Sequence, residues 1–162
     1  MVSLILVVSR EPNLVQSLRP VLQEVGYDVE AAPDGQAAAE KLDQRRPDLV
    51  VLDLAVVPPS EAPDAAGDGW EVYHRLRQRS DAPVIMLGDY AGAVTASDVI
   101  TALEHGVDDY LDRPISVREL VARVKAVLRR RLASAGEAGR PHHDHQPPHQ
   151  HHQQIQPQPG HA

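Results

Sequence analysis

The segment Asp48-Leu-Val-Val-Leu-Asp-Leu54 places four consecutive large aliphatic residues directly before an acid. A short apolar run bounded by polar residues is typical of a strand that is buried on both faces of a sheet. In open parallel sheets, ligands bind at the carboxyl ends of the strands. Asp53, at the end of this run, is therefore the first residue to consider for a function.

Similar segments lie on both sides of this run, and stretches with helical spacing of apolar residues separate them. Strands are expected at residues 4–8, 27–32, 49–52, 83–87 and about 108–111. Strands that alternate with helices are typical of βα units around a parallel sheet. The sequence therefore predicts an α/β protein with five βα units and helices on both faces of the sheet.

Several residues mark where the expected helices begin and end. Asp34 is a suitable N-cap, and Ser116-Val-Arg-Glu119 has the pattern of a capping box at the start of the last helix. Gly26 and Gly106 follow helical segments and are expected to stop them. Pro20 lies inside the first helix, where its missing N–H predicts a kink or a broken turn.

Composition excludes several classes of function. The 162 residues carry a formal net charge of −7, the wrong sign for general attraction to nucleic acid phosphates. The absence of cysteine excludes disulfides and thiolate metal sites. Because no basic residue precedes the first apolar run, neither a signal peptide nor a membrane span is expected. A cytoplasmic location is therefore predicted.

Composition changes sharply near Leu132. We expect a folded domain over 1–132 and a disordered tail over 133–162, because the tail is built mainly from Gly, Pro, Gln, Ala and His. Its imidazoles could chelate Zn²⁺, Ni²⁺ or Cu²⁺ weakly, and the alternatives are low-complexity drift or a sticky interaction tail. The tail histidines are His142, His143, His145, His149, His151, His152 and His161.

Four motifs can be taken together: Ile5-Leu-Val-Val-Ser-Arg-Glu-Pro-Asn13, the segment 48–54, Pro83-Val-Ile-Met-Leu87 and Gly106-Val-Asp-Asp-Tyr-Leu-Asp-Arg-Pro114. In combination they resemble the receiver domain of bacterial two-component response regulators, and most closely its OmpR-like branch. The resemblance covers about residues 3–131. It implies a flavodoxin-like, doubly wound sheet of five parallel strands in the order 2-1-3-4-5.

The resemblance also implies roles for particular positions. In that family the aspartate at Asp53 accepts a phosphoryl group from a histidine kinase. The step needs Mg²⁺, held by an acidic pair after the first strand, by this aspartate and by a backbone carbonyl, here that of Ala55. A hydroxyl residue after the fourth strand and a lysine after the fifth contact the phosphoryl oxygens. Tyr110 occupies the position of the aromatic switch residue, and the bond at Arg113-Pro114 is usually cis.

The residues at nearly all of these partner positions differ from the family pattern. Ser9 and Arg10 replace the acidic pair. Gly88 replaces the hydroxyl residue, and Arg113 replaces the lysine. Mg²⁺ needs several oxygen ligands in near-octahedral geometry, and a guanidinium close to the site opposes its binding. We therefore expect no cofactor and no efficient phosphorylation; Mg²⁺ is expected only if Asp53 is still a phospho-acceptor.

The substitutions suggest two hypotheses about the pocket. Arg10 and Arg113 could both pair with Asp53 and hold it in a metal-free cluster, in which case Arg10→Ala destabilises the fold. The alternative is that Arg10 points to water. Since Gly88 provides no hydroxyl, Tyr110 could rest inward permanently, uncoupled from phosphate. The alternative is a tyrosine that is merely packed at a strand end.

The segment 54–68 is longer than the resemblance leads us to expect, and long loops are either functional or mobile. It could cover Asp53, contact a partner or be a tolerated insertion. Glu11 or an acid of this segment could also support residual phosphorylation. Candidates for substitute metal ligands, which match no known metal-binding pattern, are Glu61, Asp64, Asp68 and Asp89.

In OmpR-like receivers the fourth helix, fifth strand and last helix form a symmetric dimer face with paired charges. Much of this mixed charge is present here, which favours a homodimer, whereas Val99 stands where a basic residue is usual and weakens that expectation. The alternative is a solvated charged face. Three arginines at 129–131 are interpreted as the end of a helix in preference to a nucleic acid patch. The charged residues of the dimer face are Asp108, Asp109, Asp112, Arg118, Glu119, Arg123 and Lys125.

The sequence therefore predicts an atypical, non-enzymatic receiver domain of a two-component phosphorelay that acts through contacts with a signalling protein, a histidine kinase being one candidate. Direct nucleic acid binding is not expected, since no DNA-binding output domain follows. The alternatives are a phospho-acceptor modified at Asp53 and a metal-handling protein that acts through its His-rich tail. A cofactor-binding enzyme of the same fold is disfavoured, because no Gly-rich phosphate loop follows the first strand.

Overall fold

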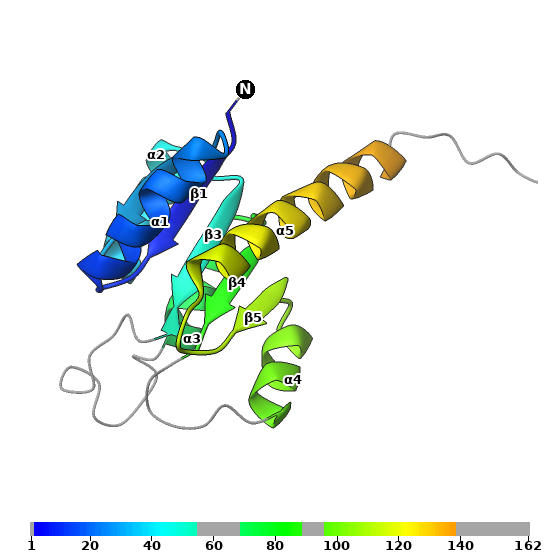
Figure 1. Cartoon of the computed structure of the whole chain (residues 1–162). Coiled ribbons are helices and arrows are strands. Elements are labelled where there is room, and N and C mark those ends of the chain that lie inside the picture. The colour runs from blue at the N-terminus through cyan, green and yellow to red at the C-terminus, as the bar shows by residue number, and fades with distance from the viewer. Residues whose placement is uncertain (1, 55–68, 89–95, 139–162) are drawn as a thin grey trace, which may run out of the picture.

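The order of strands and helices in the computed structural model follows the alternation expected from the sequence (Figure 1). The structure describes residues 2–54, 69–88 and 96–138. The strands are β1 Leu4–Val8, β2 Asp28–Ala32, β3 Leu49–Asp53, β4 Val84–Leu87 and β5 Asp109–Leu111. The helices are α1 Pro12–Glu24, α2 Gly35–Gln44, α3 Gly69–Arg77, α4 Ala96–Glu104 and α5 Val117–Ala138.

The strands pair in parallel, in the order β2-β1-β3-β4-β5. This is the five-stranded, doubly wound arrangement that the sequence predicts. In the register of β1 with β3, Val8 lies opposite Leu52. In the register of β3 with β4, Asp53 lies opposite Leu87. The carboxyl ends of the central strands therefore meet at one edge of the sheet.

Alternation along the strands divides the hydrophobic core into two layers. Ile5 and Val7 of β1 belong to the layer that α1 and α5 cover. Leu6 and Val8 belong to the layer that α2, α3 and α4 cover. Successive side chains of a strand point to opposite faces, so a strand that is covered on both sides needs apolar residues at every position. Figure 1 shows α1 and α5 crossing the near face of the sheet.

Local signals set helix ends where the sequence predicts them. The Asp34 carboxylate accepts a hydrogen bond from the Ala37 N–H at 2.8 Å and caps α2. Gly26 and Gly106 follow α1 and α4 with φ angles of 101° and 92°, a region that favours glycine. At the start of α5, the Glu119 N–H donates to the Ser116 hydroxyl at 3.3 Å, which is one half of the predicted capping box.

Of the kink or broken turn predicted at Pro20, the broken turn is wrong, because α1 is continuous from Pro12 to Glu24. The kink stays a prediction. Proline removes the hydrogen bond to the carbonyl four residues earlier, that of Gln16. Both residues are exposed, so water can satisfy that carbonyl, while the buried side chains of Leu18 and Leu22 hold the helix on the sheet.

The helix α5 continues past Leu132, where the sequence predicts the end of the folded domain, to Ala138. Arg129, Arg130 and Arg131 are therefore not in its last turn, and their interpretation as a helix end is wrong because the macrodipole acts only within that turn. Residues 133–138 include three alanines, the best helix formers, and residues 133–135 are helical although they are exposed. The rest of the predicted tail lies outside the described residues.

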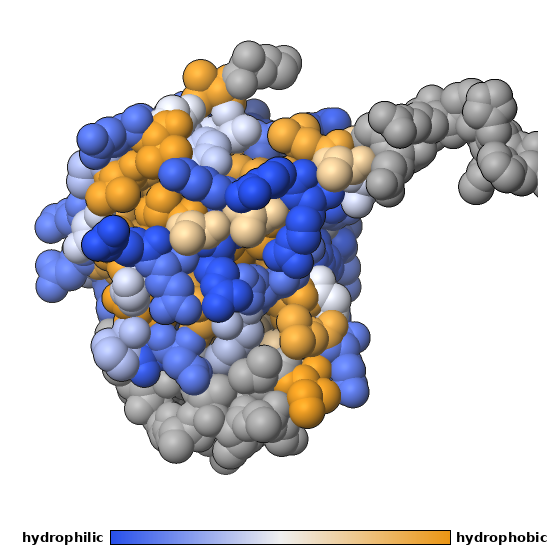
Figure 2. Space-filling view, turned by 45° about the vertical axis from the view of Figure 1, so that its right-hand side comes forward, coloured by the Kyte–Doolittle hydropathy of each residue, from blue (hydrophilic) through white to orange (hydrophobic). Residues whose placement is uncertain are grey.

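Polar side chains cover most of the surface that Figure 2 shows, apart from apolar areas such as the one over α4. On that helix Ile100 and Leu103 are 54% and 51% exposed. None of the helices within the three described ranges is long and apolar enough to cross a membrane. The peptide bond Arg113-Pro114 is cis, as the resemblance implies.

Candidate functional site

Loops at the carboxyl edge of the sheet bring the predicted pocket residues together. Ser9 follows β1, Asp53 ends β3, Gly88 follows β4 and Arg113 follows β5. All the strands run in the same direction, so residues that are distant in sequence meet at this edge. Asp53 is contacted by Ser9 and Arg113, which are 44 and 60 positions away in the chain.

Asp53 is a buried carboxylate whose two oxygens both accept hydrogen bonds from the protein. Its side chain is 1% exposed. Oδ2 accepts from Ser9 Oγ at 2.9 Å, and Oδ1 accepts from Arg113 Nη2 at 2.5 Å. A buried charge is tolerated when a charge of opposite sign and further hydrogen bonds compensate it. Arg113 and Ser9 supply these two kinds of partner.

Arg113 connects several segments at this edge. Its side chain is 9% exposed, and Nε donates to the Gly88 carbonyl oxygen at 2.8 Å. Nη2 also lies 3.7 Å from Oε1 of Glu11. One guanidinium thus contacts the end of β3 and the segments that follow β1 and β4. The structure places Arg113 against Asp53, where the metal-free cluster hypothesis needs it.

Ser9 has a role that sequence reasoning misses. The sequence presents it only as a replacement for an acid, yet it is buried and its hydroxyl donates to Asp53 while accepting from the Glu11 N–H at 3.1 Å. The available signal is a hydroxyl directly after the strand that neighbours β3. Arg10 is exposed at the end of β1, and its part in the cluster hypothesis stays a prediction.

Tyr110 lies beside the space that a side chain at position 88 would fill. A Cβ added at Gly88 would be 2.9 Å from the Tyr110 hydroxyl oxygen and 3.5 Å from Asp112 Oδ1. Tyr110 is half-buried and packs against the core layer under α2, α3 and α4. Its hydroxyl is therefore directed toward the position at which the family carries a hydroxyl residue.

The described pocket residues do not fit a Mg²⁺ ion. Such an ion needs free carboxylate oxygens and water in an octahedral arrangement, but Arg113 Nη2 lies between two carboxylates, 2.5 Å from Asp53 and 3.7 Å from Glu11. Within residues 2–54, 69–88 and 96–138, no group of three or more His, Asp or Glu side chains could hold a metal ion. Outside the described residues lie Ala55, Glu61, Asp64, Asp68, Asp89 and the tail histidines.

Several charged side chains of the predicted dimer face form ion pairs or hydrogen bonds within the chain. Arg123 Nη1 lies 3.2 Å from Asp109 Oδ2, and Arg123 Nη2 lies 3.5 Å from Glu119 Oε1. Asp108 Oδ2 accepts a hydrogen bond from the Val84 N–H at 2.9 Å. These groups would have to exchange partners to pair across a two-fold axis. The side chain of Val99 lies outside the described residues.

The strand order and the buried aspartate at the end of β3 define the class of this protein. The family described as "Response regulator receiver domain" matches residues 5–125. The chain therefore belongs to the response regulator receiver domain family.

Known proteins show how this chain relates to others of the class. "Probable transcriptional regulator ycf27" of Porphyridium aerugineum is 42% identical over 126 residues, which cover 78% of this chain and 48% of that protein. "Alkaline phosphatase synthesis transcriptional regulatory protein PhoP" of Bacillus subtilis is 42% identical over 127 residues, with coverage of 78% and 48%. A two-component response regulator from Clostridium difficile is 27% identical, with a TM-score of 0.66 over 80% of this chain and 98% of that one. This chain spans about half the length of the curated relatives that it matches.

Proposed function

We propose that this receiver domain signals through protein–protein contacts, without efficient Mg²⁺-dependent phosphorylation of Asp53. The observation that carries the proposal is the Arg113 guanidinium, 2.5 Å from Asp53 Oδ1 in a buried site. Phosphoryl transfer needs an available oxygen nucleophile and a cation that neutralises the charge that develops. Here the guanidinium binds one carboxylate oxygen and the Ser9 hydroxyl binds the other.

The guanidinium supplies positive charge but does not replace the metal ion. It is held by the Gly88 carbonyl and by Asp53 itself, so it stabilises the carboxylate before any reaction. An interaction that stabilises the reactant as much as the transition state does not lower the barrier. We therefore expect phosphorylation to be slow even where Asp53 is accessible to a phosphodonor.

The position of Tyr110 supports an output that does not depend on phosphate. In the family, the switch residue moves inward when the hydroxyl residue follows the phosphoryl group. Gly88 has no hydroxyl, and the Tyr110 oxygen already lies 2.9 Å from where a Cβ at position 88 would be. In this proposal the edge formed by β4 and β5 has one fixed conformation that a partner recognises.

The partner in this proposal is a signalling protein, and a histidine kinase or a second copy of the chain are the candidates. Ile100 and Leu103, exposed on α4, favour a contact through the face that α4, β5 and α5 form. The curated relatives are named as transcriptional regulators. The expectation that this chain does not itself bind nucleic acid stays a prediction, as does its cytoplasmic location.

The test is incubation of the chain with acetyl phosphate or beryllofluoride, with and without Mg²⁺. Intact mass reports modification, and Trp70 fluorescence reports binding of the phosphate mimic. We expect no gain of mass and no change of fluorescence that depends on Mg²⁺. Stoichiometric, Mg²⁺-dependent modification at Asp53 would overturn the proposal.

The matched control restores the residue types of the family in one variant: Ser9→Asp, Arg10→Asp, Gly88→Ser and Arg113→Lys. This variant is expected to gain Mg²⁺-dependent modification under the same conditions, since it regains acidic ligands and loses the guanidinium. Adding Asp53→Asn to it removes the acceptor and is expected to abolish the gain.

A phospho-acceptor that a histidine kinase modifies at Asp53 is the second candidate. Its support is the place of Asp53 at the end of β3 and the Glu11 carboxylate in the same pocket. Under this reading Mg²⁺ is required, and Arg113 must move away from Asp53 before the ion binds. The incubation described above separates the two candidates.

A metal-handling role for the tail is a third candidate, supported by the seven histidines between His142 and His161. Calorimetry with Zn²⁺ or Ni²⁺ on the full chain and on a chain without residues 139–162 tests it. Binding that disappears with the tail would support it, and equal heats from both chains would oppose it.

A further inference from the structure

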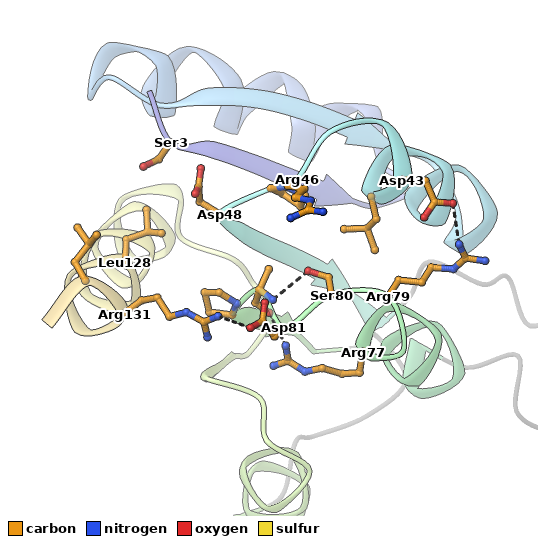
Figure 3. Close-up of a pocket in the computed structure, with 15 residues that line it drawn as sticks. Ser3, Asp43, Arg46, Asp48, Arg77, Arg79, Ser80, Asp81, Leu128 and Arg131 are labelled. Atoms are coloured by element: carbon orange, nitrogen blue, oxygen red, sulfur yellow. Dashed lines mark hydrogen bonds and ion pairs between the residues drawn. The ribbon is translucent and has the colours of Figure 1, made fainter. Parts of the chain in front are cut away.

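Arg46, Arg79 and Arg131 line a hollow at the amino edge of the sheet, opposite the edge that carries Asp53 (Figure 3). Its volume is about 770 Å³, which is in the range of small-molecule sites. The three arginines come from the segment before β3, the segment before β4 and the helix α5. Leu42 and Leu128 contribute apolar parts of the lining.

Basic residues outnumber acidic residues in this hollow, in contrast to the chain as a whole. Four arginines and three aspartates line it, whereas the chain carries a net charge of −7. A local excess of positive charge in a hollow concentrates anions. The charged lining residues are Arg46, Arg77, Arg79, Arg131, Asp43, Asp48 and Asp81.

Two of these arginines are paired with exposed carboxylates that a stronger anion can displace. Arg79 Nη1 lies 2.8 Å from Asp43 Oδ2, with the side chains 44% and 61% exposed. Arg131 Nη2 lies 3.3 Å from Asp81 Oδ2, with the side chains 47% and 99% exposed. Exposed ion pairs contribute little stability, so a change of partner costs little. Arg46 is exposed and has no ion-pair partner in the part of the chain that the structure describes.

The fourth arginine, Arg77, holds the wall of the hollow in place. Its guanidinium donates to the carbonyl oxygens of Ala82 at 2.5 Å and Gly106 at 3.1 Å. Ser80, in the same wall, accepts a hydrogen bond from the Ala82 N–H at 3.1 Å, and its own hydroxyl proton remains to donate to a ligand. A wall that is already ordered reduces the entropy lost on binding.

We propose that this hollow binds a compact anion with two or more phosphate groups, either free pyrophosphate or the pyrophosphate unit of a nucleotide. Guanidiniums form paired hydrogen bonds with phosphate oxygens. In Figure 3, Arg79 faces Asp43 and Arg131 faces Asp81. Both arginine side chains are exposed and flexible, so each can turn from its carboxylate toward an anion held in the hollow with Arg46. The site lies at the edge opposite Asp53, and it does not depend on the function proposed for that residue.

The test is calorimetric titration of the full chain with sodium pyrophosphate in the absence of divalent cations. We expect saturable binding of one anion per chain, weakened about tenfold by Arg46→Ala and by Arg131→Ala. Arg129→Ala is the matched control, because it removes an exposed arginine of α5 that does not line the hollow. Asp81→Asn is expected to strengthen binding, since it frees Arg131 from its carboxylate.

A parallel titration with ADP distinguishes the two sources of the anion. Equal affinity for ADP and pyrophosphate means that the phosphates alone are recognised, and higher affinity for ADP identifies a nucleotide. The proposal would be overturned if neither anion bound saturably. It would also be overturned if Arg129→Ala and Arg46→Ala lowered the affinity for pyrophosphate equally. Asp53→Asn is expected to bind pyrophosphate like the unaltered chain, so failure here is distinct from failure of the proposed function.

Discussion

At the scale of single residues, the Asp53 carboxylate has to be compensated because it is buried and charged. Arg113→Ala leaves it without its charged partner and is expected to lower the free energy of unfolding by about 3 kcal/mol. Solvent screens this pair little, since the two side chains are 9% and 1% exposed. Urea denaturation measures the difference.

The control for this variant is Arg118→Ala, which removes an exposed arginine of α5 and is expected to change the free energy by less than about 0.5 kcal/mol. Equal midpoints for Arg113→Ala and the unaltered chain would contradict the role assigned to Arg113. The same measurement on Arg10→Ala tests the wider cluster hypothesis, which expects a lower midpoint for that variant as well.

A second residue-scale prediction concerns the close approach of Gly88 and Tyr110. Gly88→Ala places a Cβ 2.9 Å from the Tyr110 hydroxyl oxygen and is expected to destabilise the chain by about 1 to 3 kcal/mol. In the Tyr110→Phe background the oxygen is absent, so the cost of Gly88→Ala is expected to be smaller. Urea denaturation of the two single variants and the double variant measures this coupling. Strictly additive effects would show that the hydroxyl does not lie beside position 88.

The partners of Asp53 could be predicted from the sequence only in part. The resemblance points to positions 9, 10, 88 and 113. The sequence shows that the acids at 9 and 10, the hydroxyl residue at 88 and the lysine at 113 are replaced. The side chains that contact the Asp53 carboxylate come from segments 44 and 60 residues away. Their contacts therefore depend on how these segments pack. For this reason the contribution of Ser9 as a hydrogen-bond donor could not be predicted.

At the scale of elements, β2 and α2 are joined by charged side chains. Glu30 of β2 lies 2.7 Å from Lys41 Nζ and 2.6 Å from Arg45 Nη1. Hydrogen bonds from Lys41 and then Arg45 hold the pKa of the Glu30 carboxyl below its ordinary value of 4.5. Because folding lowers this pKa, the stabilisation is present above 4.5 and is lost as the pH falls through the folded value.

Glu30→Gln is therefore expected to be less stable than the unaltered chain near neutral pH. The difference is expected to disappear in acid, where Glu30 is protonated in both the folded and the unfolded chain. Thermal unfolding of the two proteins across a series of pH values measures it. A stability difference that stays constant from neutral pH down to strong acid would contradict this prediction.

The end of α5 is helical although its side chains from Leu132 to Ala135 are exposed. Leu132 is 74% exposed, and residues 133–135 are exposed as well. A chain that ends after Leu132 is expected to lose circular dichroism signal relative to one that ends after Ala138. Its free energy of unfolding is expected to change by less than about 0.5 kcal/mol, because residues 133–135 are exposed. A markedly larger loss in urea denaturation would show that these turns pack on the domain.

Elements with strong local or periodic signals could be predicted from the sequence, and others could not. The strands β1, β3 and β4 follow from short apolar runs, and the Asp34 cap follows from one side chain and the helix beside it. The end of α5 was missed because composition reports whether a segment can bury surface, whereas an alanine-rich segment can stay helical without burial. The continuity of α1 through Pro20 depends on which face is exposed, which the proline alone does not reveal.

At the scale of the whole molecule, the parallel sheet separates two polar regions. Asp53 lies at the carboxyl edge among groups that compensate its charge, and the arginine-lined hollow lies at the amino edge. The strand order could be predicted from the resemblance. The hollow could not, because Arg46, Arg79 and Arg131 are distant in sequence and only the packing of α5 against the segments before β3 and β4 brings them together.

We propose that the Asp53 pocket accepts neither a divalent cation nor a phosphoryl group. The amide NMR resonances of Ser9, Gly88 and Arg113 report on this pocket while Mg²⁺, and then beryllofluoride, are added to the full chain. No saturable shift of these amide resonances is expected in either titration. Saturable shifts with Mg²⁺ that disappear in Asp53→Asn would contradict this proposal.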